Sequence, residues 1–168
     1  MAEAAVAAVN LGASVIGFIG LTGQILQGCQ FVCGCLDDIK GAPMELQNFI
    51  DQVKSFESGI RSFRYSLEKA AKSIDISLLE EKIKLSLKLG QSTIRDLRDL
   101  VNNHKHNGKR DWWKGIKFAK KKNIFTKYVN RLNQVKIALI CAQSNLSKYF
   151  RLLVSEKRWS LTNLVLSP

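Results

Sequence analysis

The chain has 168 residues, of which 46% are hydrophobic and 24% are charged, and its formal net charge is +12 at pH 7. One domain is expected at this length, and the apolar content is ample for its core. The charge is uneven: residues 1–36 carry −1, residues 37–104 are neutral and residues 105–168 carry +13. A basic C-terminal third favours an acidic partner, which could be anionic lipid, nucleic acid or an acidic protein surface.

Residues 4–36 are the most unusual segment, because these 33 residues contain no charge and six of the chain's eleven glycines. About 20 apolar residues span a bilayer as a helix, so the segment is long enough to cross a membrane. Its three glutamines would need hydrogen-bond partners in lipid, and Glu3 stands where a secretory signal has Lys or Arg. We therefore expect a buried helix of a soluble bundle, contacted on most sides by the other helices. Its glycines weaken it by roughly 1 kcal/mol each, which makes it the element most easily released.

The later segments repeat their apolar residues at three- and four-residue spacing, and none alternates as a strand would. A second helix is predicted over residues 43–71, after the Gly41 and Pro43 break. A third is predicted from a cap at Ser73 or Asp75 to residue 101, with Gly90 as its weak point. Residues 102–109 read as a loop. A fourth helical region follows, with a break expected near residues 122–123.

This pattern predicts an all-α fold, a four- to five-helix antiparallel bundle with an apolar, Gly-rich N-terminal helix. The bundle domain is expected over residues 1–154. The remaining tail, residues 155–168, is expected to be either a short docking helix or a frayed end.

No catalytic arrangement is visible in the sequence, so we expect no enzyme activity, no cofactor and no small-molecule substrate. The one Gly-Lys pair is not followed by the Ser or Thr of a phosphate-binding loop, and the two histidines have no motif partner. Cys29, Cys33 and Cys35 lack the spacing and the fourth ligand of a zinc site. They are expected to be small buried apolar residues, with S-acylation beside a membrane-seeking helix as the alternative.

Bases interleaved with aromatic residues form a dense run over residues 105–122. Tryptophan beside lysine suits a bilayer interface with anionic lipid, and the same chemistry suits single-stranded nucleic acid. A third interpretation is that the lysines only keep the domain soluble while one tryptophan caps the core. The residues predicted to bind an anionic surface are Lys109, Arg110, Trp112, Trp113, Lys114, Lys117, Lys120, Lys121 and Lys122.

Three features together resemble the fungal N-terminal helical domains of NLR-type (STAND) receptors, the HeLo-like and SesA-like group. They are the small apolar start through residue 36, the junction Asp-Ile-Lys-Gly-Ala-Pro at residues 38–43 followed by Glu-Leu, and the block Trp-Lys-Gly-Ile-Lys-Phe-Ala at residues 113–119 before a long helix. The resemblance covers residues 1–146. It does not extend to the nucleotide-binding module and repeats of a full receptor.

The resemblance implies a cytoplasmic domain of innate immunity and regulated cell death that relocates to the plasma membrane on activation. An upstream receptor or signalling protein would cluster it into a homo-oligomer, and its N-terminal helix would then enter anionic membrane lipid. Carried onto this chain, the inserting helix is residues 4–36, and Glu3 would line an assembled pore. The alternatives are an interaction and oligomerisation adapter that never enters lipid and, less favoured, a basic nucleic-acid binder. The residues assigned to insertion are Glu3, Gly12, Gly17, Gly20, Gly23 and Gly28.

Overall fold

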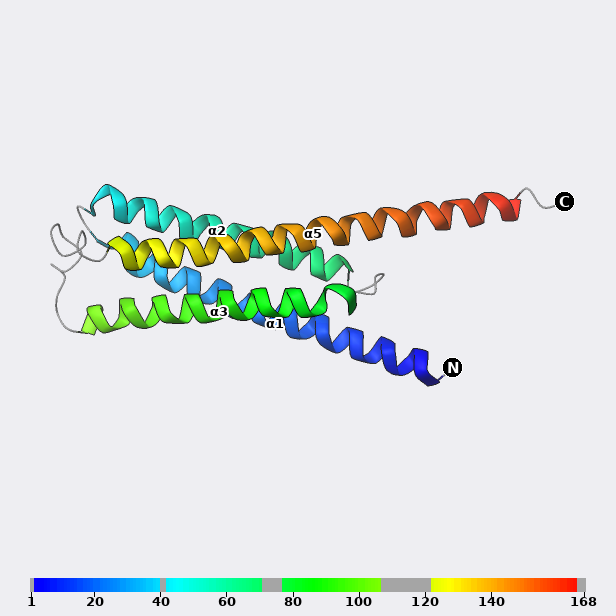
Figure 1. Cartoon of the computed structure of the whole chain (residues 1–168), viewed down its shortest axis with the longest axis horizontal. Helices are drawn as coiled ribbons and strands as arrows, with labels where there is room; N and C mark the ends of the chain where they lie inside the picture. Colours follow the sequence, from blue (N-terminus) through cyan, green and yellow to red (C-terminus); the bar gives the residue numbers. More distant parts are fainter. Residues whose placement is uncertain (1, 40–41, 71–76, 107–121, 166–168) are drawn as a thin grey trace.

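The computed structural model describes residues 2–39, 42–70, 77–106 and 122–165, and within them it contains four helices and no strand. They are α1 (Ala2–Asp37), α2 (Met44–Ala70), α3 (Ser77–His106) and α5 (Lys122–Val165), shown in Figure 1. The predicted all-α bundle with an apolar, glycine-rich first helix is confirmed.

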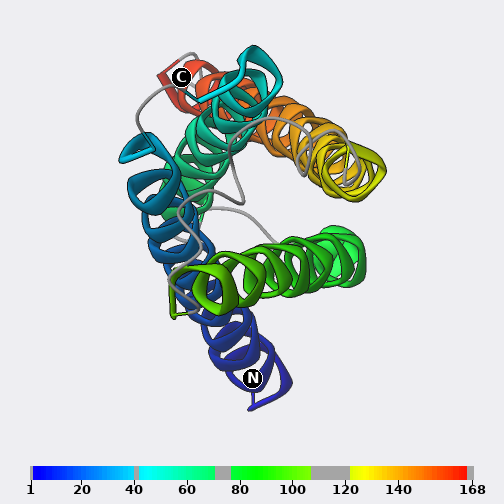
Figure 2. The ribbon, with the colours of Figure 1, turned by 90° about the vertical axis from the view of Figure 1, so that its left-hand side faces the viewer.

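The four helices occupy the corners of a bundle, seen end-on in Figure 2. α1 packs against α2 and α3, and α5 packs against the same two helices from the other side, so α1 and α5 are diagonal partners. Consecutive helices alternate in direction along the chain. Because α2 and α3 also lie on a diagonal, two of the packed pairs, α1 with α3 and α2 with α5, run parallel to each other.

The core is built from the apolar stripes that the sequence predicts. Apolar residues recur at three- and four-residue spacing along α2, and the nine that form this stripe are all buried: Leu46, Phe49, Ile50, Val53, Phe56, Ile60, Phe63, Leu67 and Ala70. Phe56 and Phe63 are among the largest fully buried side chains. α3 contributes Leu87 and Leu97, and α5 contributes Leu132. Three- and four-residue spacing places such side chains on one helical face, which then packs against the neighbouring helices.

Gly90 lies where all four helices meet, rather than at a weak point of α3. A Cβ atom at this position would lie 3.3 Å from Cγ1 of Val135, 3.4 Å from Cδ1 of Ile25 and 3.4 Å from the ring of Phe56. The glycine costs helix propensity, but it lets side chains of α1, α2 and α5 converge on the α3 backbone. Low helix propensity alone therefore does not describe the role of Gly90 in α3.

Two helix ends differ from the prediction. α3 continues to His106, so the loop predicted over residues 102–109 is wrong for residues 102–106. The backbone hydrogen bonds of a helix can continue past Val101, its last buried apolar residue, because a solvated end needs no apolar stripe. α2 begins at Met44, and the Pro43 carbonyl accepts hydrogen bonds from the N–H groups of Leu46 (2.9 Å) and Gln47 (3.2 Å). The predicted caps at residues 73 and 75 lie outside the described residues.

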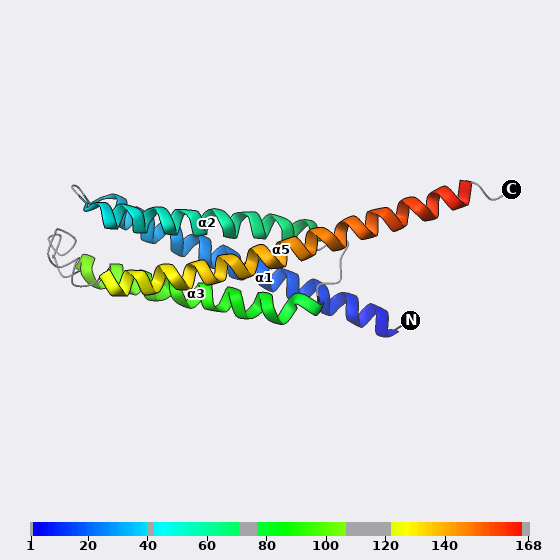
Figure 3. The same cartoon turned by 45° about the horizontal axis from the view of Figure 1, so that its top comes forward.

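The C-terminal tail is the continuation of α5, which runs without interruption to Val165. It is therefore neither a separate docking helix nor a frayed end up to that residue. The last part of α5 extends beyond the ends of α2 and α3, and the first part of α1 extends past the same end of the bundle (Figures 1 and 3).

Candidate functional site

α1 is a corner helix, so the expectation that the other helices would surround it is wrong. In a ring of four helices each member has two neighbours, and those of α1 are α2 and α3. One face of α1 is buried against them, and the opposite face is open to solvent. The buried residues of this helix, among those whose exposure is described, are Val15, Phe18, Thr22, Ile25, Leu26, Gly28, Cys29, Val32, Cys33 and Leu36.

The open side of α1, which we call the outer face, carries no charge between residues 14 and 34. Its exposed residues are Ile16, Gly17, Gly20, Gln24, Gln27, Gln30 and Gly34. Ser14–Asp37 is long and apolar enough to cross a membrane, and 44% of the 18-residue apolar window within it is buried in the bundle. A core helix of a soluble protein meets the same criterion, so the uncharged outer face is the more informative property.

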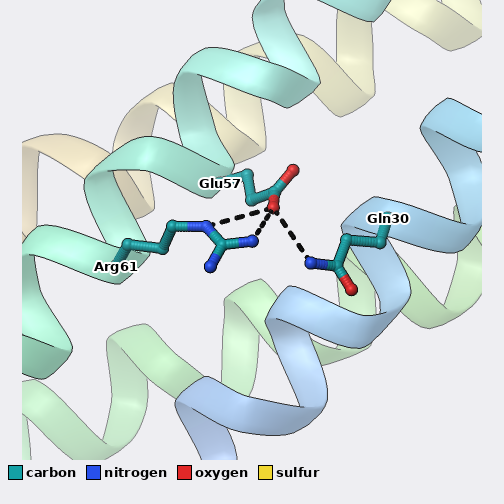
Figure 4. Close-up of polar contacts among 3 residues, drawn as sticks. All are labelled: Gln30, Glu57 and Arg61. Carbon is teal, nitrogen blue, oxygen red and sulfur yellow. Dashed lines mark hydrogen bonds and ion pairs between the residues drawn. The ribbon is translucent and has the colours of Figure 1, made fainter.

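A polar cluster joins the C-terminal third of α1 to the middle of α2 (Figure 4). One carboxylate oxygen of Glu57 accepts a hydrogen bond from Nη2 of Arg61 at 2.6 Å and another from Nε2 of Gln30 at 3.5 Å. The Glu57 side chain is only 15% exposed, so solvent screens this cluster less than an open surface pair. Glu57 was not among the residues predicted from the sequence. Its position four residues before Arg61, on the same helix face, does indicate an ion pair between the two.

Two further contacts hold α1 against α3 and α2. Ser14 donates a hydrogen bond to Glu80 of α3 at 2.7 Å, and Lys54 of α2 pairs with Asp37 at 3.0 Å. The Asp37 hydrogen bond raises the pKa of Lys54. Both partners of that ion pair are about half exposed, so it adds little to stability. Packing therefore holds α1 in place more than charge does.

Two contacts pair residues of α1 and α3 that occur in the same order along both helices, as expected for parallel neighbours. The Arg98 guanidinium lies 5.0 Å from the centre of the Phe31 ring, and Gln91 donates a hydrogen bond to Gln24. Thr22, fully buried, donates to the Ile19 carbonyl within its own helix at 2.8 Å. The buried hydroxyl of Thr22 is thus hydrogen-bonded within α1, and the surface amides of Gln24 and Gln30 are hydrogen-bonded to neighbouring helices.

The glycines predicted to act in insertion fall into different environments. A Cβ at Gly17 or Gly20 would meet nothing within 4 Å, and one at Gly23 would lie 3.9 Å from the Arg64 guanidinium. Gly28 is different, because its Cβ would overlap Cγ2 of Ile94. Gly28 therefore permits the close approach of α3, whereas Gly17 and Gly20 are not required by packing.

Glu3 and Gly12 lie in the first third of α1. Of the predicted anionic-surface residues, Lys122 is the first residue of α5. The other eight lie at positions 109–121, outside the described residues. The binding of an anionic surface by this run stays a prediction.

The cysteines of α1 are protected by the fold. Burial raises the pKa of Cys29 well above its ordinary value, and the nearby carboxylate of Glu57 raises it further. Burial and then Asp37 raise the pKa of Cys33 to about 11. Cys35 is half-buried and Cys141 on α5 is exposed. Since S-acylation needs an accessible thiolate, Cys29 and Cys33 are packing residues while α1 stays in the bundle. Among the described residues, no group of His, Cys, Asp and Glu side chains could hold a metal ion.

Thiol labelling is expected to report whether α1 is in place. At about pH 8, a thiol of pKa about 11 is only ~0.1% thiolate, and Cys33 is buried whereas Cys141 is exposed, so Cys33 should react more slowly than Cys141 by about tenfold or more. Because the thiolate fraction rises with pH, labelling of Cys33 should accelerate up to about pH 11. Mass spectrometry of maleimide-labelled peptides measures both rates, and a Cys141→Ser variant assigns the fast one. Equal rates for Cys33 and Cys141 would show that α1 is not packed.

Comparisons with known proteins leave the family open. No family model matches the chain, and no curated protein or solved structure matches it significantly. The function must therefore be argued from the geometry of α1 and its neighbours.

Proposed function

We propose that this chain is a signalling or effector domain of fungal innate immunity and regulated cell death, which acts by conditional insertion of α1 into the membrane. In this proposal the bundle stays in the cytoplasm until an upstream receptor or signalling protein clusters it. α1 then leaves α2 and α3 and enters the anionic plasma membrane. The observation that carries the proposal is the outer face of α1, which presents no charged side chain from residue 14 to residue 34.

The physical argument compares the two environments of α1. Its buried residues, such as Ile25 and Val32, avoid water equally well against α2 and α3 or against acyl chains. After insertion the outer face would expose glycines and amides to acyl chains but no charged side chain, so moving this face into lipid does not require burying a charge. The Gln30–Glu57 and Lys54–Asp37 contacts must break. Of their three ionised side chains, Glu57 and Lys54 stay on α2 and Asp37 is the last residue of α1.

An interaction and oligomerisation adapter without membrane activity is the second candidate. The fit of Gly28 against Ile94 and the hydrogen bond from Ser14 to Glu80 favour it, because they hold α1 in a defined register on α3. The two proposals differ in one requirement: only the first needs α1 to separate from the bundle.

Charges on the outer face of α1 distinguish the candidates. In a Gly20→Glu/Gln27→Glu variant both carboxylates would point to solvent in the bundle, where Gly20 has open space and Gln27 is exposed. In lipid they would lie near the centre of the span at a cost of roughly 2.5 kcal/mol or more each. Dye release from anionic liposomes should therefore fall about tenfold or more, while the thermal midpoint changes by only a few degrees.

The matched control places two glutamates on exposed apolar positions of another helix. Leu85→Glu/Leu89→Glu on α3 changes the net charge equally and should keep most of the release. Equal release by wild type and the α1 variant, or no release by wild type, would contradict insertion and favour the adapter.

A further inference from the structure

A polar groove runs between α2 and α5, on the side of the bundle opposite the α1–α3 side. We call it the serine groove; it encloses about 420 Å³, and its polar lining is Ser55, Ser58 and Ser62 from α2 with Lys136 and Gln143 from α5. Apolar side chains also line it, among them Phe56 and Ile140. Gly59 lies between the serines, and a Cβ there would come 3.7 Å from Cγ of Lys136. Small residues on α2 thus leave space beside α5.

The polar groups of the serine groove are arranged as donors. Nζ of Lys136 donates a hydrogen bond to Oγ of Ser55 at 2.7 Å, and Nε2 of Gln143 donates to Oγ of Ser62 at 3.1 Å. Both serine hydroxyls accept, so each has a hydrogen left to donate to a ligand. Nε2 of Gln143 also donates to Oγ of Ser66 at 2.9 Å, so its two hydrogens are both used within the protein. The groove therefore offers hydroxyl and ammonium donors to an acceptor-rich ligand.

Positive charge continues along α5 beyond the serine groove. A second depression of about 450 Å³ shares Ile140 and Gln143 with it and reaches Lys148 and Arg151. Neither depression has an acidic residue in its lining, and α5 has none from residue 122 to residue 155. The α2 acids Glu57 and Glu68 are paired with Arg61 and Arg64 of their own helix.

Exposed apolar residues accompany these cations. Ile137 is 63% exposed and Ile140 is 49% exposed, and Ile140 lines both depressions. From Lys136 to Arg151 the α5 axis extends by about 22 Å, the length of four helical turns. A ligand that matches this surface is elongated, carries several negative charges along its length and has an apolar ridge.

We infer that the serine groove and its continuation to Arg151 form a docking surface for an acidic amphipathic helix of a partner protein. Carboxylates of the partner would meet Lys136, Lys148 and Arg151, and its apolar ridge would cover Ile140. A flat bilayer fits this surface less well, because the groove lies on the α2–α5 side of the bundle, opposite the α1–α3 side, and would hold the lipid-compatible helix away from the membrane. The inference goes beyond the proposed function and does not depend on membrane insertion.

A peptide titration tests this surface without lipid. The probe is a capped helical peptide of about 15 residues with glutamates flanking a leucine ridge, and a second peptide carries lysine in place of every glutamate. We expect the acidic peptide to bind with a dissociation constant below about 100 μM at low salt and to shift the NMR signals of the Gln143 side chain. The lysine peptide should bind about tenfold or more weakly.

Charge-reversal variants locate the binding. Lys148→Glu/Arg151→Glu should weaken the acidic peptide about tenfold or more, and Lys84→Glu/Lys88→Glu, at exposed positions of α3, should leave it within about twofold. Absence of saturable binding, equal binding of the lysine peptide, or equal loss in both variants would overturn the inference. Binding of anionic vesicles that needs Lys148 and Arg151, without peptide binding, would also overturn it and would assign the surface to lipid.

Discussion

A disulfide between α1 and α3 is expected to abolish dye release in its oxidised form and to restore release on reduction. The pair is Gly28→Cys/Ile94→Cys, in a background where the four native cysteines are replaced by alanine. A Cβ at Gly28 would lie 3.6 Å from Cβ of Ile94, within the spacing of roughly 3.5–4.5 Å that disulfides adopt. Replacing Ile94 also removes the Cγ2 atom that Gly28 accommodates. Dye release from anionic liposomes, measured with and without reductant on one preparation, gives the result.

The expected loss is complete because the bond removes the step that insertion requires. A closed loop from residue 28 to residue 94 is worth about 4 kcal/mol in the chain-entropy account, and the covalent bond also prevents α1 from separating from α3 at any lipid concentration. The single variant Ile94→Cys in the same background is the control, and its release should not depend on reductant. Release by the oxidised double variant at the rate of the reduced one would show that α1 does not need to leave α3.

The helical core could be predicted from the sequence because its signal is local. Nine apolar positions of α2, from Leu46 to Ala70, recur at three- and four-residue spacing, and every one is buried. In such a helix the charged residues fall on the opposite face, so the pattern alone identifies the side that packs.

The place of α1 could not be predicted in the same way. A segment without charge satisfies a central helix, a corner helix and a membrane span equally, because nothing in its pattern marks a solvent side. The outer face is revealed only by packing, which leaves Gly17, Gly20 and Gln24 exposed. Gly20 and Gly28 look alike in the sequence, yet only Gly28 lies against α3.

Contacts between helices likewise could not be predicted from the sequence. The hydrogen bond from Gln30 to Glu57 and the serine groove depend on which helices are neighbours, and the diagonal placement of α2 and α3 decides that. One sign of the groove is present in the sequence, because Ser55, Ser58 and Ser62 recur at three- and four-residue spacing on α2. Small polar residues in such a stripe are compatible with a solvent face or a helix interface, and only the structure separates the two.

Replacing Gly90 by valine is expected to lower the free energy of unfolding by about 3 kcal/mol, at the upper end of the usual cost of overpacking. The new Cβ would press on Val135, Ile25 and Phe56 at 3.3–3.4 Å, and two γ-methyl groups must be accommodated in addition. For a chain of this size that loss lowers Tm by roughly 6–12 °C, which thermal or urea unfolding followed by circular dichroism can measure.

Gly20→Val is the matched control, because it makes the same chemical change on an exposed helix surface with no neighbour within 4 Å. Valine has the higher helix propensity, so this variant should be as stable as wild type or more stable by a few tenths of a kcal/mol. Similar effects in the two variants would mean that helix propensity governs both sites and that α1, α2 and α5 do not converge on Gly90. A large cost at Gly90 alone would instead show that side chains of three helices pack closely against a residue that lacks a side chain, so removing α1 and its Ile25 would open the core there.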